Sequence, residues 1–435
     1  MKKPFKTPFF HDIIKTKITR EVSSMLNAKE ANVLRDLAQQ YMEFAVRPQQ
    51  RELEKLWIAH NTGSGVRPMV LVDQIPWHEM NADGSLTTVI TAPYWKEVET
   101  SLRQTLYKMR FIPSDLVLPP YILLPRILKD PFFRTFGLKV QEHTAQTDIH
   151  NSVISHSYIK QFEAMEDLEK LNPSDLCADT AQEQEIWEEA QRIFEGIAPI
   201  RWQGVMMHSG LWDTISEWQG VEECYYMLLD EPEPLHALLG RMTDIMLKWI
   251  DQGNAQGLFD TASGICHCSH TLVKPFSETP DPLPGTSANS WTFGMAQLFT
   301  AVSPDVTKEF ELPYASRIFE RFGNVYYGCC EKLDDRLDLV ASLPHVRKVS
   351  CSPWSDPKHF AASLPEQLVM SFKANPALVG AGDMDAVREN LQGAINAARR
   401  ENRRLEIILK DISTVQYHPE RLTEFGKTAL EMVQN

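Results

Sequence analysis

Two adjacent cysteines and a glutamate, Cys329, Cys330 and Glu331, directly follow a short apolar run at 325–327. The run has the β-branched and aromatic composition of a buried strand, and Gly328 ends it. Polar groups at the carboxyl end of a strand lie where α/β folds build their sites. Thiolates bind zinc or attack electrophiles, so this segment predicts a catalytic site with Cys329 and Glu331. The alternatives are two inert buried thiols and an acid that only begins the next helix.

A second cluster, Cys266, His267, Cys268 and His270, places four groups that bind soft metals within five residues. It follows another strand-like run, so its side chains can reach Cys329. We expect His267 and Cys268 to join Cys329 as zinc ligands. The alternative is a polar loop whose cysteines are incidental.

Further polar and aromatic residues stand at the ends of predicted strands. Asp73 and His78 follow the first run, where one of them can serve as acid or base, although His78 also suits a helix start. The expected substrate- or cofactor-binding residues are Trp291, Tyr327 and Trp354 for a flat apolar ligand, with Arg201, His208, Asp356 and Lys373 as polar contacts. The alternatives are core aromatic residues, an outward-facing arginine and a simple Lys–Asp ion pair.

Strand-like runs must position these groups, and most of them precede a helical pattern. The runs are 69–73, 138–143, 199–205, 257–260, 324–327, 346–350, 368–372 and 405–409, and the clearest helical segments are 182–194, 232–252, 306–322 and 384–401. About eight strand–helix units predict an α/β protein with a (β/α)8 TIM barrel. A doubly wound open sheet is the alternative. Residues 1–66 form a predicted helical flank, residues 67–435 the barrel, and 273–290 a loop long enough to be a lid.

Composition narrows the class of protein. The chain has 435 residues and a net charge of -14, which argues against nucleic acid and anionic membranes as partners. No apolar run approaches the length of a membrane helix. Seven irregularly spaced cysteines indicate a reducing compartment, so we expect a cytoplasmic protein. The partner is expected to be a small-molecule substrate, and a homodimer is left open.

Several of these pieces occur in an order that resembles the uroporphyrinogen decarboxylase superfamily, which includes methyltransferases that demethylate methylcobamides. The matching segments are 220–223 with 228–233, 302–305 with 309–314, 327–331, and 373–376, and together they span roughly half of the chain in the expected order. The resemblance implies a (β/α)8 barrel. It also implies a methyltransferase that works with a corrinoid, a corrinoid protein and a thiol acceptor, with zinc as a metal.

The chain departs from both branches of that superfamily. Segment 74–80 lacks the arginines with which the decarboxylase itself holds substrate carboxylates, and Arg201, Arg321 and Arg347 are the remaining candidates for that role. Tyr327 stands where the methyltransferases have a zinc-binding histidine, and no cysteine follows the strand near Lys373. Of the two branches, the resemblance favours the methyltransferases. A decarboxylase for carboxylated substrates and a non-catalytic tetrapyrrole- or corrinoid-binding protein are the alternatives.

Overall fold

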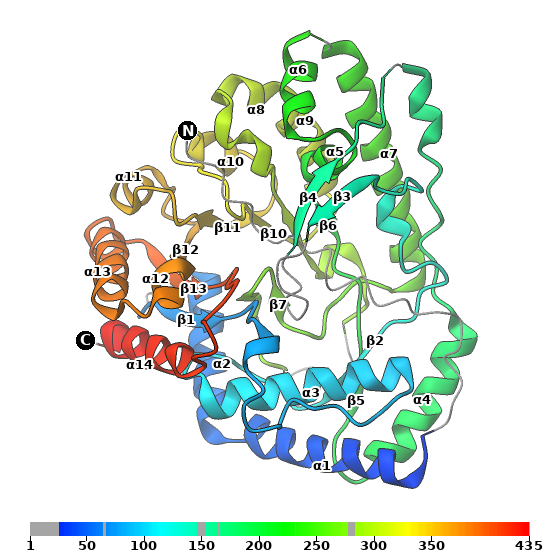
Figure 1. Cartoon of the computed structure of the whole chain (residues 1–435), viewed down its shortest axis with the longest axis vertical. Coiled ribbons are helices and arrows are strands. Elements are labelled where there is room, and N and C mark those ends of the chain that lie inside the picture. Colours follow the sequence, from blue (N-terminus) through cyan, green and yellow to red (C-terminus); the bar gives the residue numbers. More distant parts are fainter. Residues whose placement is uncertain are drawn as a thin grey trace.

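A computed structural model describes residues 26–63, 67–145, 154–163, 165–230, 232–276 and 283–434. It is a mixed α/β fold with a parallel central sheet (Figure 1). The α-helices are α1 (Ala28–Ala45), α2 (Pro48–Thr62), α3 (Pro93–Phe111), α4 (Thr180–Phe194), α5 (Leu211–Gln219), α6 (Val221–Asp230), α7 (Pro232–Gln256), α8 (Pro304–Phe310), α9 (Leu312–Phe319), α10 (Leu337–Ala341), α11 (Pro357–Ser363), α12 (Pro376–Ala381), α13 (Met384–Arg400) and α14 (Glu420–Gln434).

Seven parallel strands form the central sheet in the order β1-β13-β12-β11-β10-β9-β6. Their bounds are β1 (Met69–Val72), β6 (His208–Ser209), β9 (Trp291–Gly294), β10 (Asn324–Tyr327), β11 (Val346–Cys351), β12 (Val369–Ala374) and β13 (Arg404–Leu409). Strands that follow one another in the chain from β9 to β13 are also neighbours in the sheet, and β1 pairs with β13 from Met69↔Glu406 onward. Within the described residues, no ladder joins the edge strands β1 and β6.

The remaining named strands form three smaller sheets. They are β2 (Ile122–Pro125) with β5 (Ile200–Gln203), which is parallel, and two antiparallel pairs, β3 (Glu142–Ala145) with β4 (Ser155–Tyr158) and β7 (Ile265–Cys266) with β8 (Ser269–His270). Short 3-10 helices lie at η2 (Trp77–Glu79), η3 (Phe133–Thr135), η4 (Met165–Lys170), η6 (Ser287–Asn289) and η7 (Gln297–Ala301).

Helices cover one face of the central sheet and polar side chains line the other. Figure 1 shows α11 to α14 in orange and red on the outside of β11 to β13. The amphipathic helix α13 buries Val387, Leu391 and Ile395, which are four residues apart and share one face. Strand side chains alternate between the two faces. Tyr327 therefore bonds to Glu311 at the helices, whereas Tyr326 faces inward and bonds to Ser371.

The β7–β8 hairpin lies against the inward face of the sheet, and Figure 1 shows β7 near the middle of the molecule. Its two-residue turn, His267–Cys268, has positive φ at both positions, 45° and 65°. That backbone suits asparagine and glycine and strains other residues, and such strain is typical of functional sites. Ser269 bonds to Glu406 of β13, and His270 accepts a hydrogen bond from the backbone N–H of Val117. These contacts keep the hairpin buried among the strands.

Two predicted strands are wrong. The run at 138–143 forms a strand only from Glu142, and β3 belongs to a largely exposed antiparallel hairpin, because its polar side chains suit a solvated surface. The run at 257–260 makes only an isolated bridge, Val205↔Phe259. Conversely, β2, β6 and β9 were not predicted. All four residues of β9 are buried, and a Cβ on Gly294 would lie 2.3 Å from the Phe319 ring, so helix α9 packs directly on this strand.

The four clearest predicted helical segments are confirmed as α4, α7, α8 with α9, and α13. Helices α1 and α2 lie in the expected flank, whose residues 1–25 are outside the described range, and the boundary after residue 66 stays a prediction. Part of the expected lid, 277–282, also lies outside that range. Across the described residues, none of the helices combines the length and apolar character that a bilayer crossing requires.

Candidate functional site

A sharp turn after β10 places Cys329 and Cys330 at the carboxyl end of the sheet. Gly328 has φ of 92°, and a Cβ there would lie 2.7 Å from the Leu333 side chain, so this turn requires glycine. The buried Glu331 carboxylate accepts the Cys329 backbone N–H at 2.7 Å and the Ala296 N–H at 3.2 Å. Glu331 thus anchors the cysteine loop to the segment after β9, and its catalytic role stays a prediction.

The end of β13 supplies the two charged partners of the thiols, Lys410 and Asp411. Asp411 has φ of 55°, and its backbone N–H donates to the Gln74 side chain at 3.2 Å. Gln74 itself has φ of 47°. The ends of β1 and β13 are therefore tied together in a strained conformation, a feature that is frequent at functional sites.

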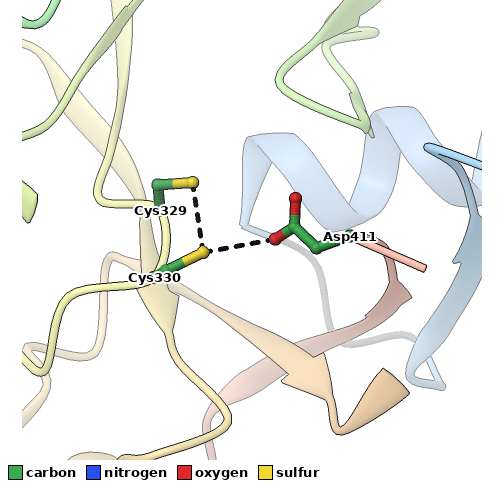
Figure 2. Close-up of side chains that lie close together, drawn as sticks. All are labelled: Cys329, Cys330 and Asp411. Atoms are coloured by element: carbon green, nitrogen blue, oxygen red, sulfur yellow. Dashed lines mark hydrogen bonds between the residues drawn. The ribbon is translucent and has the colours of Figure 1, made fainter. Parts of the chain in front are cut away.

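The four side chains form one connected cluster, which we call the thiol cluster: Cys329, Cys330, Lys410 and Asp411. The Cys330 sulfur lies between the Cys329 sulfur, at 3.5 Å, and Asp411 Oδ2, at 3.2 Å (Figure 2). Lys410 Nζ lies 3.1 Å from Cys329 Sγ and 2.9 Å from Asp411 Oδ2. Cys329 and Lys410 are buried, whereas Cys330 and Asp411 are half-buried. The cluster therefore combines two thiols, one ammonium and one carboxylate.

The electrostatics of the cluster favour a thiolate on Cys329. The hydrogen bond from Cys330 and the charge of Lys410 lower the pKa of the Cys329 thiol, although burial opposes them. The pKa of Cys330 is raised well above its usual value, first by that same hydrogen bond and then by burial. Burial would lower the pKa of Lys410, but the adjacent Cys329 and Asp411 raise it well above the usual value. Of the two thiols, Cys329 therefore forms a thiolate more readily than Cys330.

Burial raises the pKa values of three carboxyl groups near the cysteine loop. Burial raises the pKa of Glu311 to about 8 and that of Asp213 well above its usual value, and it also raises the pKa of Glu331. Glu311 accepts a hydrogen bond from the Tyr327 hydroxyl at 3.2 Å. Carboxyl groups with raised pKa values hold their protons longer, so they repel the thiolate less than ionised acids would.

The cluster offers a donor set for a metal ion. One ligand atom each from Cys329, Cys330 and Asp411 lie within 4.8 Å of one another, and no other such set of three occurs in the described part of the chain. The predicted set of Cys329, His267 and Cys268 is not among them. His267 instead stacks on Phe293, with ring centroids 3.6 Å apart. The donors grouped with Cys329 are therefore its own neighbour Cys330 and Asp411, the second residue after β13.

Cys268 nevertheless lies close to the thiol cluster. Its thiol donates a hydrogen bond to Asp73, and its pKa is raised well above the usual value by burial and then by the charge of Asp73. Lys410 is near enough to oppose that rise. Burial would raise the pKa of Asp73, but its ion pair with Lys108 at 2.5 Å lowers it. Asp73 is therefore an ionised group at the edge of the cluster.

Lys373 projects from β12 into the interior beneath the thiol cluster. Its ammonium bonds to the Tyr326 hydroxyl and, at 2.9 Å, to Ser371, and the Tyr326 hydroxyl bonds to Ser371 at 2.5 Å. Burial lowers the pKa of Lys373 to about 8, and Lys410 adds to that effect. The Lys373–Asp356 ion pair, which was the alternative to a binding role for these residues, does not form, because Asp356 caps α11 by accepting the Lys358 backbone N–H.

The remaining predicted residues have other partners. His78 is 3.5 Å from Glu79, which accepts the backbone N–H groups of Val415 and Tyr417 and so fixes the segment after β13. The other placements are Arg201 over the Tyr121 ring, His208 stacked on Phe293, Trp291 beneath the Lys348 ammonium, Tyr327 toward the helices, and Trp354, 58% exposed, on the surface.

A second buried ion cluster was not predicted. It comprises Lys348, Glu406, Ser269 and His60, and we call it the interior ion cluster. Lys348 Nζ donates to Glu406 at 2.7 Å, to Ser269 at 2.7 Å and to the His270 carbonyl at 2.9 Å. Lys348 and Glu406 each interrupt an apolar strand. In the sequence, these charged residues were the sign that the two strands have a polar inward face. Lys410, at the end of the run 405–409, carried the same signal for the thiol cluster.

The described contacts do not bring together the three arginines that were candidates for holding substrate carboxylates, Arg201, Arg321 and Arg347. Arg321 pairs with Asp251 of α7, and Arg347 bonds to the Asn324 side chain at the start of β10. Arg201 lies over the Tyr121 ring. The described contacts therefore provide no convergent arginine site for a substrate with several carboxylates.

Comparisons with known proteins establish the fold alone. The sequence matches no protein-family profile and no curated protein. Among solved structures, the chain is similar to a methyltransferase from Methanosarcina mazei, with a TM-score of 0.52 and 13% identity, over 87% of this chain and 98% of that one. At this identity the likeness concerns the arrangement of helices and strands, and it places the chain among folds that include a methyltransferase.

Proposed function

We propose that this chain is a (β/α)8 barrel enzyme of the uroporphyrinogen-decarboxylase-like superfamily that transfers a methyl group from a corrinoid to a thiol. The thiol cluster is the observation on which this proposal depends. A buried Cys329 sulfur lies 3.1 Å from Lys410 Nζ, beside Cys330 and Asp411, at the carboxyl ends of β10 and β13. Chemistry in parallel-strand barrels takes place at that end of the strands.

The strand order supports the barrel. From β9 to β13 each strand lies beside the next one in the chain, and β1 returns to pair with β13. A doubly wound sheet reverses its strand order near the middle, whereas a barrel places its first and last strands side by side. In this proposal β2 and β5 belong to the part of the wall between β1 and β6.

The donor set fits a zinc ion. Two thiolates bound to one tetrahedral zinc, each at about 2.3 Å, lie about 3.8 Å apart. The sulfurs of Cys329 and Cys330 are 3.5 Å apart, and Asp411 Oδ2 adds an oxygen 3.2 Å from the second sulfur. Cys329, Cys330 and Asp411 would hold the ion. Bound zinc lowers the pKa of a coordinated thiol and so raises its nucleophilicity at neutral pH.

The protein's own residues supply charge and order around that thiol. Lys410 neutralises the Cys329 thiolate, and Glu331 fixes the cysteine loop through two backbone hydrogen bonds. The protonated acids behind the loop limit repulsion of a second thiolate. A cytoplasmic location and a corrinoid-protein partner belong to the same proposal, and thiol side chains at all seven cysteines are consistent with that compartment.

Metal analysis tests the donor set. We expect purified full-length protein, loaded with zinc and then dialysed, to retain about one zinc per chain. The variants Cys329→Ser, Cys330→Ser and Asp411→Asn should lose it. Cys351→Ser is the matched control, because Cys351 is fully buried in β11 and should not affect the metal. Zinc retention that is unchanged in Cys329→Ser would contradict the proposed site.

Methyl transfer is tested by mixing the zinc-loaded protein with methylcobalamin and mercaptoethanol. Loss of the methylcobalamin spectrum, with S-methylated thiol as product, is the expected result. Cys329→Ser should abolish turnover and Cys351→Ser should retain it. Binding of methylcobalamin without loss of its methyl group would favour the non-catalytic corrinoid-binding alternative instead.

A further inference from the structure

Cys329 and Cys330 differ from the other cysteines in how close their sulfurs are. Their sulfur atoms are 3.5 Å apart, and Cys330 is half-buried, so solvent reaches this member of the pair, whereas Cys329 is buried beside it. Cys224, Cys266 and Cys351 are buried in apolar surroundings, and Cys177 is half-buried but hydrogen-bonds only to a carbonyl group. A contact between two thiols beside an ammonium and a carboxylate is the arrangement of a reactive dithiol.

We propose that Cys329 and Cys330 form a peroxide-reactive dithiol that closes to a vicinal disulfide. This modification is independent of methyl transfer and requires only the thiols and a hydroperoxide. The two sulfurs have different neighbours, because Lys410 Nζ lies 3.1 Å from Cys329 Sγ and Asp411 Oδ2 lies 3.2 Å from Cys330 Sγ.

The reaction proceeds in two balanced steps. The Cys329 thiolate attacks one oxygen of the hydroperoxide, the O–O bond breaks, and hydroxide or an alkoxide leaves, so Cys329 becomes a sulfenic acid. Cys330 then attacks the Cys329 sulfur, the S–S bond forms, and the S–O bond breaks as water leaves. Asp411 Oδ2, 3.2 Å from Cys330 Sγ, is placed to take the proton of that thiol and pass it to the departing hydroxide, which leaves as water. The two sulfurs lose two electrons in total and the peroxide gains them.

The loop geometry permits the closure. The sulfurs must approach by roughly 1.5 Å, because a disulfide bond is about 2.05 Å long. The two cysteines lie in a segment without helix or strand, between Gly328 at φ of 92° and the anchor Glu331. Adjacent cysteines form a strained ring, and a strained disulfide is readily reduced. Oxidation would therefore be reversible, and it would remove both sulfurs from the donor set.

The test uses chelator-treated full-length protein and hydrogen peroxide, followed by intact mass and peptide mapping. We expect wild type to lose two hydrogens per chain at a Cys329–Cys330 link, and dithiothreitol should restore both thiols. The half-buried Cys177 is the internal reference, and Cys329 and Cys330 should be consumed at least about tenfold faster. This comparison needs no variant, so it remains valid if a substitution impairs folding.

Two variants separate the steps. Cys330→Ser should stop at a Cys329 sulfenic acid that dimedone traps, whereas Cys351→Ser should oxidise as wild type does. Consumption of the pair at the rate of Cys177, cross-links between chains, or over-oxidation of Cys329 with Cys330 intact would each overturn the proposal. Because metal-free protein is used, this result is independent of whether zinc binding or methyl transfer is found.

Discussion

Two buried lysines of the same sheet, Lys348 and Lys410, have opposite surroundings. Lys348 donates to Glu406, Ser269 and the His270 carbonyl, and these three acceptors satisfy its three N–H groups. Lys410 instead faces Cys329 and Asp411, a sulfur and a half-buried carboxylate. This difference shows that burial and charge alone do not identify a reactive site. Partners that can themselves react, and that solvent can reach, distinguish the thiol cluster from the interior ion cluster.

The largest expected effect is on stability, in the interior ion cluster. Lys348→Met leaves the Glu406 carboxylate buried without its ammonium, which should lower the free energy of unfolding by about 3–5 kcal/mol. Urea denaturation measures it. The double variant Lys348→Met/Glu406→Gln removes both charges and should recover part of the loss. A loss below about 1 kcal/mol would show that this cluster is not the closed structural pair described above.

Glu311, near the thiol cluster, should make the free energy of unfolding depend on pH. Its pKa is raised to about 8 from an ordinary 4.5, so between these values the folded state holds a proton that the unfolded state has lost. Wild-type stability should therefore fall as pH rises through this window. Glu311→Gln cannot ionise and keeps an acceptor for Tyr327, so its stability relative to wild type should rise by up to about 4 kcal/mol between pH 5 and 9. A flat difference across that range would mean that Glu311 is not protonated in the folded state.

Lys410→Met should act on reactivity more than on stability. The hydrogen bond from Lys410 to Cys329 involves a charged group, so its loss should slow alkylation of Cys329 by iodoacetamide about tenfold at neutral pH. Peptide mapping of metal-free protein measures the rate. Lys348→Met is the matched control, and a folded sample of it should alkylate Cys329 at the wild-type rate. Equal slowing of Cys329 alkylation in both variants would contradict the distinction between the two lysines.

The smallest effect is expected at Asp356, which was predicted to bind substrate. Asp356→Ala removes the cap of α11 and should cost about 1 kcal/mol in unfolding free energy. It should leave zinc retention and the alkylation rate of Cys329 unchanged. A loss of either property, measured on folded protein, would show that Asp356 contributes to the functional site.

Sequence patterns predicted the main helices and the position of the thiols better than the partners of those thiols. A glycine and two cysteines directly after an apolar run placed Cys329 at a strand end. Lys410 follows β13, some eighty residues later, and only the pairing of strands brings it to Cys329. Alternation explains a second difference: Tyr327 was predicted to face the ligand, but its neighbour Tyr326 occupies the inward position.

Turn geometry explains why the metal donors differ from those predicted. The spacing of His267 and Cys268 suits chelation, yet the hairpin places His267 flat against Phe293 and directs the Cys268 thiol to Asp73. Both residues have positive φ, which no composition rule for a polar loop anticipates. Asp411 was not among the predicted metal ligands, and its own positive φ turns it toward Cys330.

The central claim is that the hydrogen bond from Cys330 and the charge of Lys410 hold the pKa of the Cys329 thiol below that of an ordinary cysteine. The ultraviolet absorbance of thiolate, titrated in chelator-treated wild type minus Cys329→Ser, measures this directly. We predict a thiolate band that is already present at pH 7 and that is lost at this pH in Lys410→Met. A band that appears only at the ordinary cysteine pKa of about 8.5 or above, alike in both proteins, would contradict the account.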